Sequence, residues 1–416
     1  MRIRVWLPIV LTGCLLGTAV PVAHSQSIMD RIKAKAKAKI DQKEDNAAST
    51  AVNAADPTAN HGGPANTTTA PATSSTTAAT SAAPAAPAAP GAEAPNAPAS
   101  IRAYQNYDFT PGETILFADD FTNTADGEFP AQWEILKGQA VVNKRGGYEA
   151  FLLTDGNYAT VNPRMKTKTY LPEQFTLEYD YYAVPGAYPL HVMFQHEGYT
   201  AQVFAGRSEA AYEADGISLS GSLPPAIRDD AFDNKWHHVA MVYRKPQMKV
   251  YVDQYRVLTV PDTKFIPEWF QVGGIGDQEK PIVFRNVRLA AGGAMNMVGR
   301  KFTDAKIVTH GINFDVDQAT IRPESMGVLN QIKAVLDQDP SLKFEIDGHT
   351  DNTGDSAHNQ TLSQQRADAV KAQLTSMGID AGRLTTKGFG DAKPMDSNNT
   401  PEGKANNRRV EFVRMS

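Results

Sequence analysis

A carboxylate and a guanidinium lie close together in the last quarter of the chain, at positions that suit a zwitterionic ligand. Asp351 follows the alternating run 343–346, which predicts a strand, and Arg366 falls inside the helical repeat that comes next. A carboxylate binds an ammonium group, and a guanidinium binds a carboxylate through a two-pronged contact. The alternative is a purely structural ion pair between Asp351 and Arg366, which would contribute little stability if it were exposed.

The residues around this pair predict a small α+β domain. Apolar residues recur at helical spacing over 360–377, and a second amphipathic helix over 323–336 begins with a proline near its first turn. The alternating run 409–415 predicts a closing strand. Asn359 precedes Arg366 by two helical turns, so both side chains can share one helix face.

Motifs spread from residue 307 to the C-terminus resemble the OmpA-like domain, the peptidoglycan-binding module of outer-membrane protein A, peptidoglycan-associated lipoproteins and flagellar stator proteins. The motifs are Phe314-Asp-Val-Asp317, Ile321-Arg-Pro-Glu324, Gly348-His-Thr-Asp351, Leu362-Ser363, Arg366-Ala367 and Asn407-Arg-Arg-Val-Glu411. The resemblance implies that residues 303–416 form a domain that binds the diaminopimelate side chain of a peptidoglycan stem peptide.

The same resemblance assigns roles to individual residues. It implies that Asp351 holds the ammonium group of the ligand and that Arg366 holds its carboxylate. The other residues expected to line the pocket are Thr353, Asn359, Arg408 and Asp317. Asp317 departs from the family pattern, because Asn is frequent at that position. His349 is expected to be a turn residue without metal-binding partners.

The middle of the chain, residues 101–293, predicts an all-β domain. Short runs of period two are separated by turn residues, without a long helical repeat, and a two-sheet sandwich buries such strands best. The runs are 114–117, 175–181, 191–194, 238–243, 248–253, 255–260 and 282–289. Trp236-His-His-Val-Ala240 followed by Met248-Lys-Val-Tyr-Val-Asp253 resembles the concanavalin A-like (laminin G-like) jelly roll, which implies a hairpin with Trp236 in the core.

Two pairs of acidic residues in this region suggest chemistry. Glu178 and Asp180 face one side of a strand, and retaining glycosidases use two carboxylates about 5–5.5 Å apart. The third acidic residue of the related glucanases is missing, since Ala183 follows the pair, so we expect no hydrolase. Asp119 and Asp120 suit a calcium ion or, alternatively, only a turn at the end of a strand. No other cofactor is expected.

The N-terminal hundred residues read as an export signal and a spacer. Residues 1–25 predict a signal peptide, although Leu11-Thr-Gly-Cys14 also resembles a lipoprotein signal whose cysteine is lipidated. Within residues 26–100, a basic helix over 28–45 either lies on an anionic membrane or is a solvated stub. The Ala/Thr/Pro-rich remainder is expected to be disordered.

The sequence thus predicts an exported, multidomain envelope protein that anchors itself to peptidoglycan and is not an enzyme. Its 416 residues carry a net charge of −5, which disfavours nucleic acid as a partner. Glycan or an envelope protein is the expected partner of the β-sandwich, in the periplasm or at the outer membrane of a Gram-negative cell. Two alternatives remain: an enzyme that cleaves envelope glycans, and an integral outer-membrane β-barrel protein.

Overall fold

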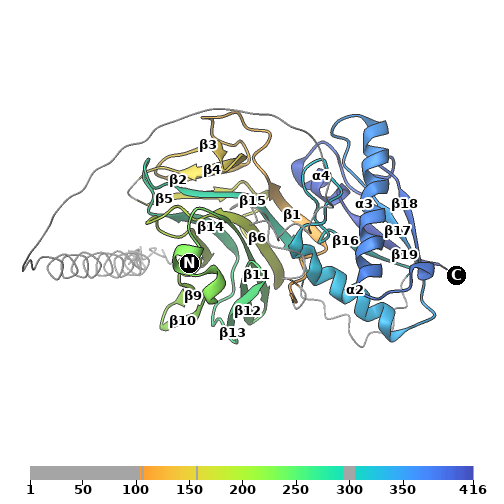
Figure 1. The fold of residues 1–416 in the computed structure, drawn as a ribbon. Helices are drawn as coiled ribbons and strands as arrows, with labels where there is room; N and C mark the ends of the chain where they lie inside the picture. The colour runs from red at the N-terminus through yellow and green to blue at the C-terminus, as the bar shows by residue number, and fades with distance from the viewer. Residues whose placement is uncertain (1–103, 105–106, 156–157, 294–304, 416) are drawn as a thin grey trace, which may run out of the picture. The chain divides into compact units, whose positions relative to one another are not determined.

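The computed structural model describes residues 104, 107–155, 158–293 and 305–415 (Figure 1). The expected signal peptide, basic helix and linker lie outside the described residues. Within the described ranges, no helix is both long enough and apolar enough to cross a membrane.

Residues 114–291 form two antiparallel sheets, as the period-two runs predict. The eight-stranded sheet has the order β13-β12-β11-β6-β15-β4-β3, with β1 also paired to β15. The seven-stranded sheet has the order β10-β9-β8-β7-β14-β5-β2. The strands are β1 (Thr114–Asp119), β2 (Trp133–Lys137), β3 (Ala140–Arg145), β4 (Tyr148–Leu153), β5 (Ala159–Pro163), β6 (Gln174–Tyr182), β7 (His191–His196), β8 (Tyr199–Ala205), β9 (Glu209–Ala214), β10 (Ile217–Ser222), β11 (Trp236–Arg244), β12 (Gln247–Val252), β13 (Tyr255–Val260), β14 (Trp269–Gly274) and β15 (Ile282–Ala291). The two-sheet, all-β architecture is confirmed, and the jelly-roll topology stays a prediction.

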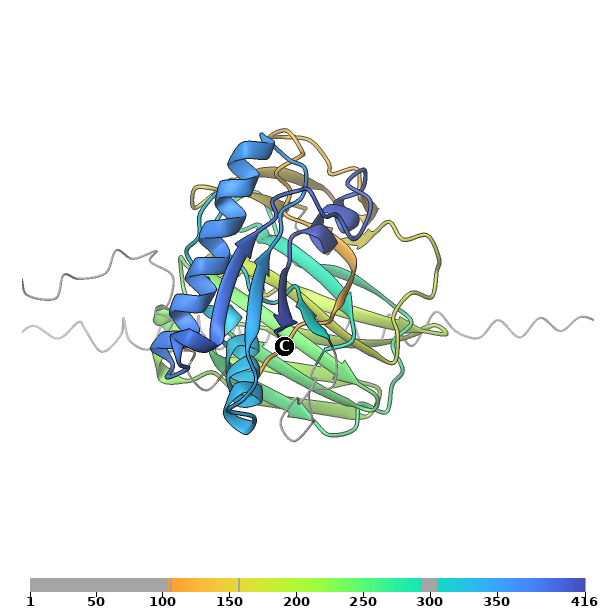
Figure 2. The ribbon, with the colours of Figure 1, turned by 90° about the vertical axis from the view of Figure 1, so that its right-hand side faces the viewer.

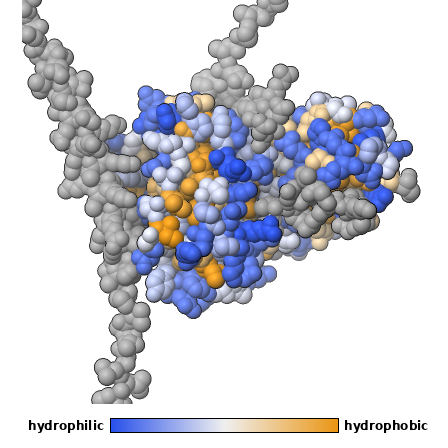
Figure 3. Space-filling view, turned by 90° about the horizontal axis from the view of Figure 1, so that it is seen from below, coloured by the Kyte–Doolittle hydropathy of each residue, from blue (hydrophilic) through white to orange (hydrophobic). Residues whose placement is uncertain are grey.

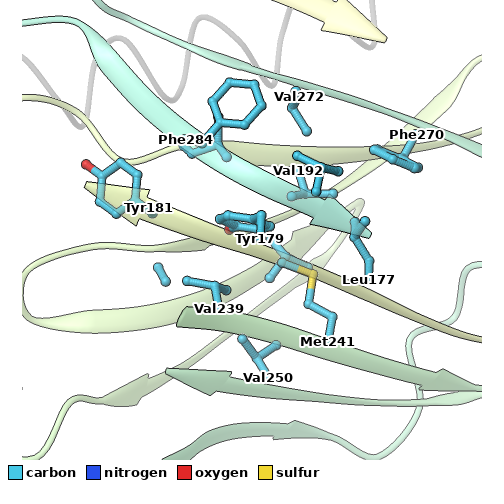
Figure 4. Close-up of a cluster of buried hydrophobic side chains, with 14 of the residues drawn as sticks. Leu177, Tyr179, Tyr181, Val192, Val239, Met241, Val250, Phe270, Val272 and Phe284 are labelled. Carbon is cyan, nitrogen blue, oxygen red and sulfur yellow. The ribbon is translucent and has the colours of Figure 1, made fainter. Parts of the chain in front are cut away.

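Alternate residues of the strands fill the space between the two sheets, as Figure 4 shows for Leu177, Tyr179 and Tyr181 of β6. The expected hairpin is present, because β11 pairs antiparallel with β12. The prediction that Trp236 lies in the core is wrong: it is partly exposed and packs at a small satellite cluster. The alternation of β11 directs the next residue, His237, to the buried side, and the core tryptophan is Trp133, which is fully buried.

The C-terminal domain has one four-stranded sheet with the order β16-β19-β17-β18. Its strands are β16 (Lys306–Thr309), β17 (Phe344–Gly348), β18 (Leu384–Gly388) and β19 (Val410–Arg414), and its helices are α2 (Met326–Gln338), α3 (Ser356–Ser376) and α4 (Pro401–Asn407). Strands β17 and β18 run parallel, which requires a crossover, and α3 supplies it. Figure 2 shows α3 running alongside this sheet, and apolar residues of α2, α3 and the sheet belong to one core cluster.

The apolar core of the C-terminal domain also includes residues of the β-sandwich region. Tyr107 and Phe109, which precede β1, and Tyr251 of β12 belong to the same buried cluster as Leu329 of α2. Helix α2 approaches so closely that a Cβ atom on Gly327 would overlap the Phe109 carbonyl. The two regions therefore share a core.

Large hydrophobic side chains are exposed at several places along the described part of the chain. The most exposed ones are Ile135, Leu136, Tyr148, Tyr199, Leu219, Ile266, Val316 and Met395, which lie on several separate strands and loops. Figure 3 shows one face of the molecule, where hydrophobic patches alternate with hydrophilic residues. Exposed apolar residues are a normal part of protein surfaces, so we assign no docking role to these.

Candidate functional site

Asp351 lies just after β17, where its carboxylate is held from two sides. Arg408 Nη1 lies 2.5 Å from Asp351 Oδ2, and the Thr353 amide donates to Oδ1 at 2.8 Å. Burial raises the pKa of Asp351, but the hydrogen bonds from Arg408 and Thr353 outweigh burial and hold that pKa below its usual range. The carboxylate is therefore charged at neutral pH. It retains lone pairs for a further cation, because a carboxylate offers about four acceptor sites.

The loop that carries Asp351 is fixed by the first turns of α3. The carboxylate of Asp355 caps the helix by accepting from the amides of Ala357 and His358. The buried amide of Asn359 donates to the carbonyl oxygens of Asp351 and Thr353, at 3.3 and 3.0 Å. The side chain of Asn359 thus holds the backbone of the loop in place. Asn359 therefore lies next to the predicted site and also stabilises the loop that carries Asp351.

Arg366 projects from α3 toward the loop that begins with Phe314. Its Nε donates to the Gln318 carbonyl at 2.9 Å, its Nη2 donates to the Asp315 carbonyl at 3.4 Å, and its guanidinium lies 5.0 Å from the centre of the Phe314 ring. Among the described residues, no carboxylate lies within ion-pair distance of this guanidinium. Burial, with Arg408 nearby, lowers the pKa of Arg366 from its ordinary value. A guanidinium held in place without a carboxylate is suited to receive one from a ligand.

The remaining predicted residues surround the same space. Asp317 has a φ of 56°, a left-handed conformation that Asn and Asp tolerate best, which explains why either residue suits this position. Its carboxylate lies 2.5 Å from His358 Nε2, and both side chains are exposed. Thr353 is exposed and its hydroxyl accepts from Lys404 Nζ at 3.2 Å.

Four charges of this set influence one another. The charges of Arg408, Asp317 and Asp351 all act on the guanidinium of Arg366. The predicted acidic and basic residues therefore lie near one another around the N-terminal half of α3. The direct partner of Asp351 is Arg408, not Arg366, so the ion pair of Asp351 and Arg366 that was considered from sequence is not formed.

Lys404 and His358 were not predicted from sequence. Each makes a single polar contact with a predicted residue. His358 lies in the first turn of α3, which begins earlier than predicted, and Lys404 lies in α4, which was not predicted. The only available sequence signal for Lys404 was the cap Thr400-Pro401, which starts α4 one turn earlier.

A second group of polar residues lies on the neighbouring strands β17 and β19 and directly after β17. Asp347, His349 and Glu411 are buried, and their potential ligand atoms lie within 4.8 Å of one another. His349 therefore does have potential metal-binding neighbours, contrary to the prediction, because β19 places Glu411 opposite Asp347. However, Lys306 Nζ and Arg409 Nε each lie 2.8 Å from an oxygen of Glu411. Since side-chain cations already compensate this carboxylate, we assign no metal to the group.

The carboxylate of Glu178 on β6 is buried and paired. Arg288 donates to its Oε1 from Nε at 3.0 Å and from Nη2 at 2.6 Å, and His238 Nε2 lies 3.4 Å from Oε2. Burial raises the pKa of Glu178, but Arg288 and His238 outweigh it and lower that pKa. A glycosidase acid needs a raised pKa, so Glu178 does not suit that role in this arrangement.

Asp180, two residues further along β6, is enclosed in the same way. His238 Nδ1 lies 3.0 Å from Asp180 Oδ1. Arg285 Nε and Arg322 Nη2 each lie 3.4 Å from Asp180 Oδ2. Arg322 precedes α2, so the C-terminal domain itself supplies one of the three cations. Only 2% of Asp180 is exposed, which leaves no room for a glycan in this arrangement.

Asp119 and Asp120 mainly stabilise a turn at the end of β1. Asp119 accepts from the Phe121 amide at 2.8 Å and from Trp133 Nε1 at 3.0 Å, and Asp120 accepts from the Thr122 amide and hydroxyl. Burial raises the pKa of Asp119 to about 6. No third carboxylate or imidazole joins them among the described residues, and calcium at this position stays a prediction.

Comparison with known proteins finds sequences that are similar to the C-terminal domain. The model of the OmpA family matches residues 313–408. The probable lipoprotein YiaD of Escherichia coli K12 is 44% identical over 104 residues, which are 25% of this chain and 48% of the relative. The peptidoglycan-binding protein ArfA of Mycobacterium tuberculosis H37Rv is 42% identical over 107 residues, 26% of this chain and 33% of the relative.

A solved structure matches a similar share of this chain. The peptidoglycan-associated lipoprotein from Burkholderia pseudomallei is 26% identical and matches 28% of this chain and 95% of that chain, with a TM-score of 0.25. The chain covers less than half the length of YiaD and ArfA. Its C-terminal part is an OmpA-like domain, while the family of the β-sandwich is not identified by these matches.

Proposed function

We propose that the C-terminal domain binds peptidoglycan without a covalent bond and so holds this protein in the cell envelope, in the periplasm or at the outer membrane. The ligand is the diaminopimelate side chain of a stem peptide. Arg366 binds its carboxylate, and Asp351 receives its ammonium group, while Thr353 and Arg408 line the same pocket beside Asp351.

The observation that carries this proposal is the unequal pairing of the two key charges. Arg366 is fixed by two backbone carbonyls and an aromatic ring, yet no described carboxylate neutralises it. Asp351 is ionised, and its carboxylate oxygens still have lone pairs that can accept a further hydrogen bond. A ligand that offers a carboxylate and an ammonium a few bonds apart complements both groups. The names of relatives such as ArfA support the same ligand class.

The proposed role is anchoring rather than catalysis. The two carboxylates that come nearest to glycosidase chemistry, Glu178 and Asp180, are buried and paired with cations. We propose that the β-sandwich is the part that the anchor holds in place. Its own ligand, a glycan or an envelope protein, is left as the expectation drawn from sequence.

The test is retention of the purified chain on insoluble peptidoglycan of the diaminopimelate type. Arg366→Ala removes the fork that holds the ligand carboxylate, and a charge-assisted hydrogen bond is worth about 1.5–3 kcal/mol, so binding should weaken about ten- to a hundredfold. Arg366→Lys keeps the charge but loses the planar fork, so it should retain an intermediate affinity.

Arg256→Ala is the matched control, because it removes an exposed arginine of the β-sandwich. It should be retained like the wild type. The proposal fails if the wild-type chain is not retained, or if Arg366→Ala and Arg256→Ala behave alike while both remain folded by circular dichroism.

A further inference from the structure

We propose that strand β1 of the β-sandwich positions the pocket of the C-terminal domain through Asn406, so that ligand affinity depends on the contact between the two regions. This inference rests on the proposed function. Three consecutive residues carry it: Asn406 contacts the β-sandwich, Asn407 contacts the loop after β18, and Arg408 contacts the pocket carboxylate.

Asn406 is buried and joins α4 to the backbone of β1. Its Oδ1 accepts from the Ile115 amide at 2.9 Å, and its Nδ2 donates to the Ile115 carbonyl at 3.3 Å and to Asp396 Oδ2 at 2.9 Å. The amide side chain thus satisfies both backbone groups of one residue, as a neighbouring strand would. Strand β1 pairs with β15 along one side, so the backbone groups that Ile115 directs to the other side of the strand need another partner.

Apolar contact and a second hydrogen bond strengthen the same attachment. Ala405 of α4 packs with Ile115 and Ala290 in a small buried cluster. The carbonyl oxygen of Asn406 accepts from His310 Nε2 at 2.8 Å, and the carbonyl of His310 accepts from Arg288 Nη1 at 2.6 Å. The C-terminal end of α4 is therefore tied to the buried ion pairs of the β-sandwich.

Asn407 transmits this position to the loops around the ligand. It is fully buried; its Oδ1 accepts from the amides of Met395 and Asp396, and its Nδ2 donates to Asn398 Oδ1 at 2.9 Å. Asn398 Oδ1 also accepts from the amide of Asn352, which is the residue after Asp351.

Arg408 completes the connection. Its backbone amide donates to the Lys404 carbonyl at 3.0 Å, and its guanidinium reaches Asp351. Since α4 has only seven residues, it has little stability of its own and depends on its packing for its position. A change at Asn406 should therefore shift Arg408 and the carboxylate that it holds.

The experiment measures binding of the whole chain to insoluble diaminopimelate-type peptidoglycan. Asn406→Ala should weaken binding about fivefold, the factor expected when a typical hydrogen-bonded anchor is lost. Asn330→Ala is the control: Asn330 on α2 also bonds the segment before β1, at the Tyr107 carbonyl, but it is not part of the pocket. It should bind like the wild type.

A double variant separates positioning from general loss of stability. If Asn406 acts through Arg408, then Asn406→Ala combined with Arg408→Ala should bind no more weakly than Arg408→Ala alone. If Asn406→Ala does not fold, Asn406→Ser retains an oxygen acceptor for the Ile115 amide and takes its place in both comparisons.

The outcomes are distinguishable. Absent binding by the wild type refutes the proposed function itself. Wild-type binding that survives Asn406→Ala unchanged, or falls equally in Asn330→Ala, or falls additively in the double variant, overturns only the positioning role.

Discussion

Removal of the Arg288 guanidinium should destabilise the protein far more than removal of an exposed arginine. In the variant Arg288→Met, Glu178 loses its two hydrogen bonds at 3.0 and 2.6 Å, and the His310 carbonyl loses its donor at 2.6 Å. Glu178 is only 3% exposed, so water cannot replace the lost partner. Breaking a buried ion pair from one side costs about 3–5 kcal/mol.

Arg256→Met provides the comparison, because Arg256 pairs with Asp108 at 2.9 Å while both side chains are nearly half exposed. An exposed pair contributes about 0–1 kcal/mol. The assay is urea unfolding of the whole chain followed by tryptophan fluorescence. A Glu178→Gln, Arg288→Met double variant should recover much of the loss, since no unpaired charge remains buried. Equal losses in Arg288→Met and Arg256→Met would refute the reasoning.

Two further predictions concern His238, which lies beside Glu178 and Asp180, and Gly327, which packs against Phe109. Burial lowers the pKa of His238, but Asp180 and Glu178 outweigh it and raise that pKa to about 10; the stabilisation is therefore complete below about pH 6.5 and is lost as the pH rises toward 10. An NMR titration of the His238 ring should show no midpoint near 6.5, and such a midpoint would contradict the buried ion pairs. Gly327→Ala should lower the free energy of unfolding in urea, although alanine favours a helix by about 1 kcal/mol, because its methyl group would overlap the Phe109 carbonyl; a stability gain would show that α2 does not pack on that segment.

Local patterns were sufficient to predict much of the fold. The period-two run 175–181 lies within β6, and the helical repeat over 360–377 lies largely within α3. The helix begins earlier than predicted, at Ser356, because the Asp355 cap is a signal separate from apolar periodicity. Helix α4 was missed because a seven-residue helix is too short to establish a periodic pattern.

The pocket was predictable as a set of residues but not as a set of pairs. The motif around Asp351 and Arg366 gave the residue types, and the structure brings them near one another around the N-terminal half of α3. Which cation contacts Asp351 depends on the end of α4, which is placed by packing against β1. The same limit applies to Glu178 and Asp180, whose partners come from β11, β15 and the residue before η4 (Pro323–Ser325). Long-range partners of this kind leave no local trace in sequence.

Calorimetry with two soluble stem peptides tests the central claim most directly. Diaminopimelate differs from lysine by one carboxylate on the side chain, and Arg366 is proposed to bind that group. The wild-type chain should bind the diaminopimelate peptide about ten- to a hundredfold more tightly than the lysine peptide, and Arg366→Ala should abolish most of this preference. Equal affinity of the wild type for both peptides, or a preference that persists in Arg366→Ala, would contradict the assignment of Arg366 as the ligand-binding guanidinium.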